Sequence, residues 1–242
     1  MKRIAFFGLI ILACLYFLLG FSSLPIQENG APTIKIIAPT AESTFRWNSL
    51  LPYEILVSDE EDGNSEYDEI TPNEVLLTVK YLKDSAEINP YLDNEANTDY
   101  KPLVQMGRAT CFNCHMAKGT LIGPSFEKIA AKYNKDPKAV ESLSKKIISG
   151  STAVWGDEKM PPHPDLKVGQ IQEMVRWILE NNTDPDKNYL AGIKGAIKTK
   201  EQTTSSSKNG ILVMTARYTD HGSDNQGESS IQAQNTVVLK NH

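Results

Sequence analysis

Cysteine is scarce in this chain of 242 residues. Only Cys14, Cys111 and Cys114 occur, so a scaffold held together by several disulfides is excluded. The sequence also lacks any run rich in Lys and Arg, and its formal net charge is −5, which argues against nucleic acid as a partner. With 40% hydrophobic and 23% charged residues, the chain is too apolar to be wholly disordered and can fill one or two cored domains.

Charge is distributed unevenly along the chain. Residues 31–99 carry four Lys and Arg against fifteen Asp and Glu, a net charge of −11. Residues 100–182 carry twelve against eight, a net charge of +4. This positive charge is modest, but it is sufficient to orient a protein partner as it approaches.

Residues 1–23 are predicted to be a signal peptide or a membrane anchor. Lys2 and Arg3 precede an uncharged apolar run at positions 4–21, which is longer than the ~7–15 residues of a usual signal core and at the lower edge of a membrane span. Cleavage near residues 20–22 and retention as an anchor both stay open, and a lipid on Cys14 is a less favoured third alternative. Each alternative places the remaining chain outside the cytoplasm, as a periplasmic, membrane-anchored or lipoprotein form.

The rest of the chain divides into β, α and β segments. Residues 31–90 and 190–242 are rich in β-formers with partial alternation, whereas residues 100–182 have helical periodicity. The expected strands lie at 33–37, 53–58, 74–82, 190–198, 211–219 and 236–240, with a polar linker at 84–99. The expected helices lie before Cys111, at 125–133, from Pro137 onward and at 167–180.

Neither β segment has enough strands to form a sandwich alone. The first offers about four strands and the second three, whereas a sandwich typically has about seven. We therefore predict that residues 31–90 and 190–242 form one split β-sandwich into which residues 100–182 are inserted. Two separate small β units flanking the helical segment are the alternative.

The motif with the clearest chemistry is Cys111-Phe112-Asn113-Cys114-His115, which has the C-x-x-C-H pattern of a c-type haem attachment site. Two cysteines at this spacing on a turn can each form a thioether with one of the two vinyl groups of a haem. The histidine that follows them then points its imidazole at the iron as the proximal ligand.

Two other interpretations of this motif are less favoured. A thioredoxin-like dithiol would open a helix after a strand, but the residues before Cys111 are predicted to be helical and polar. A zinc site would need two more Cys or His residues at matching spacing, which the sequence does not contain. Export also favours haem, because c-type haem is attached outside the cytoplasm.

Met160 is the preferred candidate for the second axial ligand. Met160-Pro161-Pro162 lies between two predicted helices, and its prolines stiffen the loop that presents the sulfur. His163 is the competitor and would give an iron with two histidine ligands. Three other methionines are less suitable as the second axial ligand because of their position or their predicted packing. They are Met106, Met116 and Met174.

Residues 100–182 resemble the small bacterial class I cytochromes c of the c-551 and c-552 type. The resemblance rests on Cys111–His115, Gly123-Pro124-Ser125-Phe126, Lys145-Lys146-Ile147-Ile148-Ser149-Gly150, Val154-Trp155-Gly156, Met160-Pro161-Pro162 and Trp177-Ile178-Leu179. It implies an all-α class I cytochrome c domain, and the β-forming flanks predict an all-β domain combined with it. It also implies one covalently attached haem c with His and Met axial ligands, in an electron carrier that is not an enzyme.

The same resemblance implies roles for individual residues. The expected cofactor-binding residues are Cys111, Cys114, Pro124 and Trp155, and the expected metal ligands are His115 and Met160. The Pro124 carbonyl would accept the proximal imidazole N–H and so fix the ring, while Trp155 would hydrogen-bond a haem propionate. One departure from the family pattern is Pro102 in the first helix, which leads us to expect a short helix there.

Short stretches of the flanks, at 45–48, 57–63 and 215–222, resemble the regions around a cytochrome module in secreted pyrroloquinoline-quinone-dependent sugar dehydrogenases. The catalytic propeller of those enzymes has no counterpart in this sequence. The resemblance implies redox partner proteins, namely a quinol- or sugar-oxidising dehydrogenase or respiratory complex as donor and a terminal oxidase as acceptor.

Other functions stay open at this stage. A haem-containing sensor would need a labile sixth position, which Met160 argues against. A β-rich module could instead bind carbohydrate or protein, with the haem as an accessory group. A run of acidic residues in the first β segment could also ligate Ca²⁺, although such runs are more often solvated loops. The run contains Asp59, Glu60, Glu61, Asp62, Glu66, Asp68 and Glu69.

Overall fold

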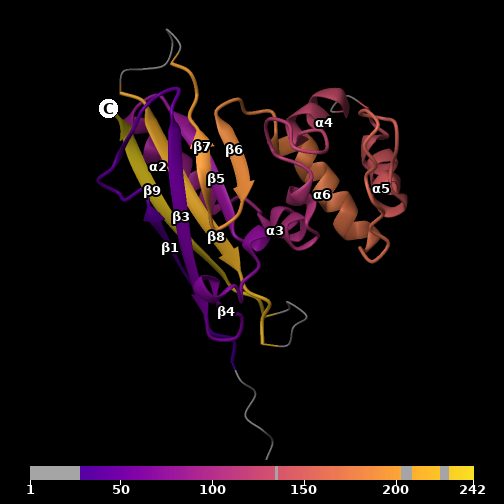
Figure 1. The fold of residues 1–242 in the computed structure, drawn as a ribbon, viewed down its shortest axis with the longest axis horizontal. Coiled ribbons are helices and arrows are strands. Elements are labelled where there is room, and N and C mark those ends of the chain that lie inside the picture. The colour runs from indigo at the N-terminus through magenta and orange to yellow at the C-terminus, as the bar shows by residue number, and fades with distance from the viewer. Residues whose placement is uncertain (1–27, 134–135, 203–208, 224–228) are drawn as a thin grey trace, which may run out of the picture.

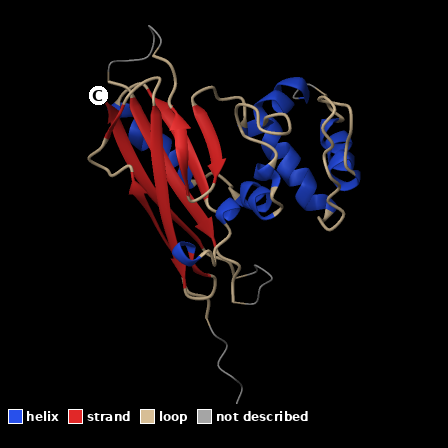
Figure 2. Cartoon of the chain, viewed as in Figure 1, coloured by secondary structure: helices blue, strands red, loops and turns tan. Residues whose placement is uncertain are grey.

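A computed structural model describes residues 28–133, 136–202, 209–223 and 229–242. The predicted signal peptide or anchor at 1–23 lies outside the described residues. The described chain forms a β-rich region beside a group of helices (Figure 1 and Figure 2). In the described part of the chain, no helix combines the length and the apolar character that crossing a bilayer requires.

The β-rich region consists of two sheets. The first contains β1 (Thr33–Ala38), β3 (Leu50–Asp59), β4 (Gly63–Asn64) and β7 (Lys194–Lys198). The second contains, in spatial order, β2 (Thr44–Phe45), β9 (Gln232–Asn241), β8 (Ile211–Thr219), β5 (Leu76–Leu82) and β6 (Lys187–Ala191). In the first sheet β7 pairs with β3, and in the second β5 lies between β6 and β8, all antiparallel. Each sheet therefore joins strands that precede the helices to strands that follow them.

The two sheets share one apolar core. Strand β8 is buried over almost its whole length. Its residues Leu212, Met214 and Tyr218 belong to the core between the sheets, whereas Ile211 and Val213 pack on the opposite face, beneath α2 (Ile88–Ala96). Successive side chains of a strand point to opposite faces, so such a strand must be covered on both sides.

Two elements differ from the sequence prediction. The segment 84–99 is predicted as a polar linker, but it contains α2, because Ile88, Tyr91 and Leu92 pack on the second sheet. The strand predicted at 190–198 is divided into β6 and β7, which belong to different sheets. Gly192 lies between them at φ +137°, a conformation that glycine adopts readily, and it lets the chain turn from one sheet to the other.

The helical region contains α3 (Lys101–Arg108), α4 (Phe126–Tyr133), α5 (Ala139–Ser149) and α6 (Val168–Asn181). Its core also includes Leu76 of β5 and Tyr189 of β6, so the helices pack directly on the β-rich region. The members of this core from α3, α4 and α6 include Leu103, Val104, Met106, Phe126, Ile171, Met174, Val175, Trp177 and Ile178. The predicted combination of an all-α domain with a β-rich region is confirmed.

Helix α3 attaches the helical region to the sheets. It is short, as the sequence predicts, with eight residues. At Gly107 a Cβ atom would lie 2.6 Å from the carbonyl oxygen of Asn73, so only glycine permits this approach. Arg108 donates from Nη2 to the carbonyl oxygens of Thr219 and Asp220, at 3.0 and 2.8 Å. The start of the helical region is therefore held against the end of β8.

Candidate functional site

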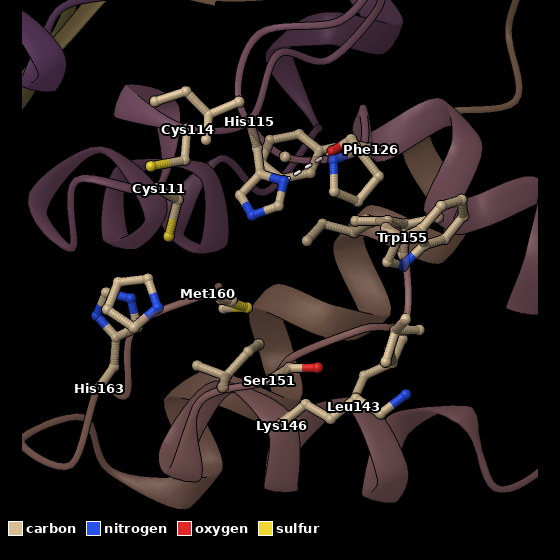
Figure 3. A pocket seen from close by; sticks show the side chains of 18 of the residues that line it. Cys111, Cys114, His115, Phe126, Leu143, Lys146, Ser151, Trp155, Met160 and His163 are labelled. Atoms are coloured by element: carbon tan, nitrogen blue, oxygen red, sulfur yellow. Dashed lines mark hydrogen bonds between the residues drawn. The ribbon is translucent and has the colours of Figure 1, made fainter. Parts of the chain in front are cut away.

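A cavity in the helical region contains the side chains that the sequence analysis singled out (Figure 3). It holds about 1200 Å³ of space free of protein atoms, part of which is open to solvent. His115 lies on one side of this space and Met160 across from it, with Cys111 and Cys114 nearby (Figure 3). The walls are mostly apolar and include Met106, Phe126, Ile129, Leu143, Ile147, Met174, Val175 and Ile178.

The two cysteines are positioned by a single turn of 3₁₀-helix, Cys111–Asn113. The carbonyl oxygen of Cys111 accepts hydrogen bonds from the backbone N–H groups of Cys114 and His115, at 3.2 and 3.0 Å. Both cysteine side chains line the cavity. Before a haem is attached, burial raises the pKa of the Cys111 thiol to about 11.

His115 is oriented by the loop that follows it. Its Nδ1 lies 2.7 Å from the carbonyl oxygen of Pro124. Because a carbonyl oxygen only accepts hydrogen bonds, Nδ1 must carry the proton, and Nε2 is left with a lone pair for a metal. Burial lowers the pKa of His115, and the hydrogen bond to Pro124 opposes this shift only in part. The imidazole is therefore neutral at pH 7, as a metal ligand must be.

Met160 is held by the backbone. Its N–H donates to the carbonyl oxygen of Ser151 at 2.9 Å, and the N–H of Ser151 donates back to the carbonyl oxygen of Met160 at 3.1 Å. Gly150 precedes this bridge at φ +77°, and a Cβ atom there would lie 2.9 Å from the Met160 carbonyl oxygen. The N–H of His163 donates to the carbonyl oxygen of Ile147 at 2.9 Å. The loop is thus tied to the end of α5.

The other predicted residues are found in or near the same cavity. His163 lines it (Figure 3), so the structure keeps this residue close to the predicted ligands. Trp155 lines it too, but its side chain is 42% exposed, and the Nζ of Lys132 lies 4.4 Å from the centre of its ring. Met106 and Met174 are wall residues, as their predicted packing implies, whereas Met116 is not part of the lining.

Sequence reasoning does not place Tyr133 in this site, and it includes Lys146 only as part of the family resemblance. Both line the cavity, and the Nζ of Lys146 donates to the hydroxyl of Tyr133 at 3.5 Å. Lys146 lies on the same face of α5 as Leu143 and Ile147, because residues three and four apart are neighbours on a helix. Helical periodicity was therefore a signal that could have identified Lys146.

Comparisons with known proteins match the helical region. The model of the cytochrome c family matches residues 104–182. Cytochrome c-551 of Allochromatium vinosum is 34% identical over 77 residues, which cover 32% of this chain and 82% of that protein. Cytochrome c-552 of Nitrosomonas europaea is 36% identical over 69 residues, which cover 28% of this chain and 67% of that protein. A crystal structure of cytochrome c552 from Nitrosomonas europaea has 33% identity and a TM-score of 0.30, and the match covers 31% of this chain and 93% of that one.

Through residues 104–182 the chain belongs to the cytochrome c family. It resembles the c-551 and c-552 cytochromes within this family, as the sequence predicts. It is therefore an electron carrier and not an enzyme, and it interacts with redox partner proteins. Its cofactor is one covalently attached haem c with His and Met axial ligands.

The residues around the cavity fit this cofactor. Haem c needs two thiols on one side, a neutral imidazole, a second axial donor opposite it and an apolar surrounding. Cys111, Cys114 and His115 provide the first two requirements, and Met160 faces His115 across a mostly apolar space (Figure 3). The fit therefore rests on the donor atoms and on the shape of the site.

Gly123 is required by the position of His115. A Cβ atom at residue 123 would lie 2.5 Å from Cε1 and 2.8 Å from Nδ1 of the imidazole. We expect Gly123→Ala to displace the ring, weaken the hydrogen bond to Pro124 and destabilise the folded protein by about 1–3 kcal/mol, as overpacking does. Denaturant unfolding and the absorption spectrum of the haem protein measure both effects.

The control for this substitution is Gly169→Ala. Gly169 lies in α6, and a Cβ atom there would meet nothing within 4 Å. Alanine should be neutral or slightly stabilising at this helical position. Equal behaviour of the two variants would show that Gly123 does not constrain His115.

Proposed function

We propose that Cys111 and Cys114 bind the haem through thioethers and that His115 and Met160 coordinate its iron, so that the protein carries single electrons between redox proteins. The observation that carries this proposal is the orientation of His115. Its Nδ1–H donates to the carbonyl oxygen of Pro124. Its Nε2 is left for the iron, on the side of the cavity that Met160 faces. The bound haem supplies reversible one-electron chemistry.

The protein's own residues control that chemistry by their charge and rigidity. A neutral imidazole and a neutral thioether add no negative charge to the iron, and His/Met coordination raises the reduction potential of c-type haem. The apolar walls limit the access of water. The Ser151–Met160 bridge and the Pro124 hydrogen bond keep the two ligands in place. Axial ligands that move little when the iron changes its oxidation state favour rapid electron transfer.

Exposed side chains at the edge of the cavity support a role in docking redox partners. Leu121 and Ile122 are 51% and 56% exposed, and Ile122 and Trp155 also line the cavity. We infer that redox partners approach the edge of the cavity that these exposed side chains form. Lys146 and Lys159 line the same cavity and can attract an acidic partner surface. Trp155 also lines the cavity, so its indole N–H is available to donate to a haem propionate.

We also propose that residues 31–90 and 190–242 constitute one domain, with residues 100–182 inserted as the cytochrome domain. The pairing of β3 with β7 and of β5 with both β6 and β8 supports this division. The core between the sheets supports it too, because it contains residues from both segments.

Export and the nature of the donor remain part of the same proposal. The apolar run at 4–21 supports export to the periplasm, with or without an anchor. The resemblance of the flanks to sugar dehydrogenases supports a quinol- or sugar-oxidising dehydrogenase as the donor. A terminal oxidase would then receive the electrons.

Spectroscopy and mass spectrometry of the protein purified from its native membrane or periplasm test this proposal. We expect the mass of one haem on the peptide containing Cys111 and Cys114, a low-spin spectrum with a far-red Met–iron band when oxidised, and reversible one-electron reduction. A haem released by denaturation, or a five-coordinate iron, would contradict the assignment. The same mass spectrum identifies the mature N-terminus.

A further inference from the structure

Three of the buried side-chain oxygens that have no hydrogen-bond partner in the described part of the chain lie near the turn after β3. They are Oδ1 of Asn29, Oδ2 of Asp59 and Oε2 of Glu61. Asp59 is only 7% exposed, so its free oxygen has little access to water. Buried polar atoms are nearly always paired, and an unpaired carboxylate oxygen is especially unfavourable. The two carboxylate oxygens among them favour a cation as the missing partner.

Hydrogen bonds position the two carboxylates and leave one oxygen of each available. Oδ1 of Asp59 accepts from the backbone N–H groups of Glu61 and Asp62, at 3.1 and 2.8 Å. Oε1 of Glu61 accepts from the backbone N–H of Gly30 at 3.2 Å. In each of the two side chains, one oxygen accepts hydrogen bonds from the backbone, and the other oxygen is available to bind a ligand.

Asn29 is oriented in the same way. Its Nδ2 donates to Oδ2 of Asp220 at 3.0 Å and to the carbonyl oxygen of Ser229 at 2.9 Å, which leaves Oδ1 as the free acceptor. Gly30, the next residue, contacts Glu61, so the segment at 29–30 lies between Asp220 and the turn after β3. Side chains from three separate parts of the chain are thus brought together.

The charge of this region also favours a cation. Asp220 is fully buried, and its Oδ1 is occupied by the N–H groups of Gly222 and Ile231. Among the described residues, no salt bridge involves Asp59, Glu61 or Asp220.

We propose that Asn29, Asp59 and Glu61 bind a Ca²⁺ ion. The free donors are all hard oxygen atoms, which suit Ca²⁺, whereas zinc prefers nitrogen and sulfur. Within the described part of the chain, no three His, Cys, Asp or Glu side chains are grouped as a metal site. The proposed ligands are two carboxylates and one amide, and backbone carbonyls and water would complete the six to eight oxygen ligands that Ca²⁺ takes.

This set differs from the acidic run that the sequence suggests. Glu66, Asp68 and Glu69 are exposed, and Oε2 of Glu69 already accepts from the backbone N–H of Asn64 at 2.8 Å. They are not part of the proposed site. Asn29, which the sequence analysis does not identify, belongs to it because the fold brings residue 29 next to the turn after β3.

Binding of Ca²⁺ would join the segment at 29–30 to the end of β3 and to Asp220. The backbone carbonyl of Asp220 in turn accepts from Arg108 of α3, which lies three positions before Cys111, the first residue of the haem attachment motif. The ion would therefore stabilise the end of the β-rich region on which the cytochrome domain is held.

The test uses the full-length haem protein, freed of divalent ions by a chelator. Isothermal titration with CaCl₂ should show one saturable site with a Kd of about 10⁻³ M or tighter, in the range of Ca²⁺ sites of extracellular modules. The midpoint of thermal unfolding should rise with added Ca²⁺. Asp59→Asn and Glu61→Gln should each weaken binding by about tenfold or more, because each removes one charged ligand.

Glu66→Gln is the matched control, since it removes an equal charge from the same part of the sequence but should leave binding unchanged. The absence of Ca²⁺ binding at millimolar concentration overturns the proposal. So does binding that persists in both Asp59→Asn and Glu61→Gln, or an equal response to Mg²⁺, which would indicate general charge screening. If Asp59→Asn does not fold, Glu61→Gln and the titration of the unaltered protein still decide. The haem spectrum should not change in any variant, so this result is independent of the proposed haem ligands.

Discussion

Met160→Ala should keep the haem covalently attached but lose the far-red Met–iron band completely. The alanine side chain has no donor atom, and the bridge between Ser151 and residue 160 involves only backbone atoms and so remains possible. The iron should become high-spin or bind water or another side chain. Its reduction potential should fall, because the thioether ligand that raises it is missing. Absorption spectroscopy and a potentiometric titration measure these two effects.

His163→Ala and Met116→Ala are the informative controls. His163 lines the cavity and is the competing ligand, whereas Met116 is 36% exposed and lies outside the lining. Both variants should retain the Met–iron band. A band that survives in Met160→Ala, together with a changed spectrum in His163→Ala, would assign the second axial position to His163.

Glu95→Gln should cause the largest loss of stability among single substitutions in the β-rich region. Glu95 of α2 is buried and forms salt bridges with Lys187 of β6 and with Arg217 of β8. The Tyr100 hydroxyl donates to the same carboxylate. The guanidinium of Arg217 lies 3.9 Å from the centre of the Tyr100 ring, and its Nη1 donates to Thr78 at 3.1 Å. This network connects α2 to both strands that flank β5.

The glutamine leaves two cations in the interior without a counter-charge. Removing one partner from a buried ion pair typically costs about 3–5 kcal/mol, because the remaining charge stays buried and unpaired. We expect a decrease of this size in the free energy of unfolding, measured by denaturant titration. Glu141→Gln is the control, since Glu141 pairs with Lys145 on the exposed face of α5 and should cause no measurable change. Similar stability of the two variants would show that the buried network is dispensable.

The same network predicts a pH dependence. Burial alone would raise the pKa of Glu95, but the hydrogen bonds from Lys187 and Tyr100 and the nearby positive charges lower it below its ordinary value. A lowered pKa in the folded state contributes stability above the unfolded pKa of about 4.5. This contribution is lost as the pH falls through the lower folded value. Glu95→Gln should therefore reduce the acid sensitivity of unfolding.

The sequence alone determined the local chemistry of this protein. The spacing of Cys111, Cys114 and His115 specifies a haem attachment site because two thioethers and one axial ligand must come from a single turn. The periodicity of residues 100–182 predicts the helices, and the family match confirms the cytochrome c domain. These features could be predicted because each depends on residues that are close together in the chain.

Only the tertiary structure decided which distant segments meet. Strand pairing across the intervening helices depends on contacts between residues more than 100 positions apart, such as Leu76 with Arg217. The change of sheet at Gly192, the packing of α2 and the placement of Tyr133 beside Lys146 are likewise set by packing. The unpartnered oxygens of Asn29, Asp59 and Glu61 become visible as a group only in the folded chain. Local patterns carry no information on such contacts, because side chains far apart in sequence gain their burial and their charge partners only when the whole domain has formed.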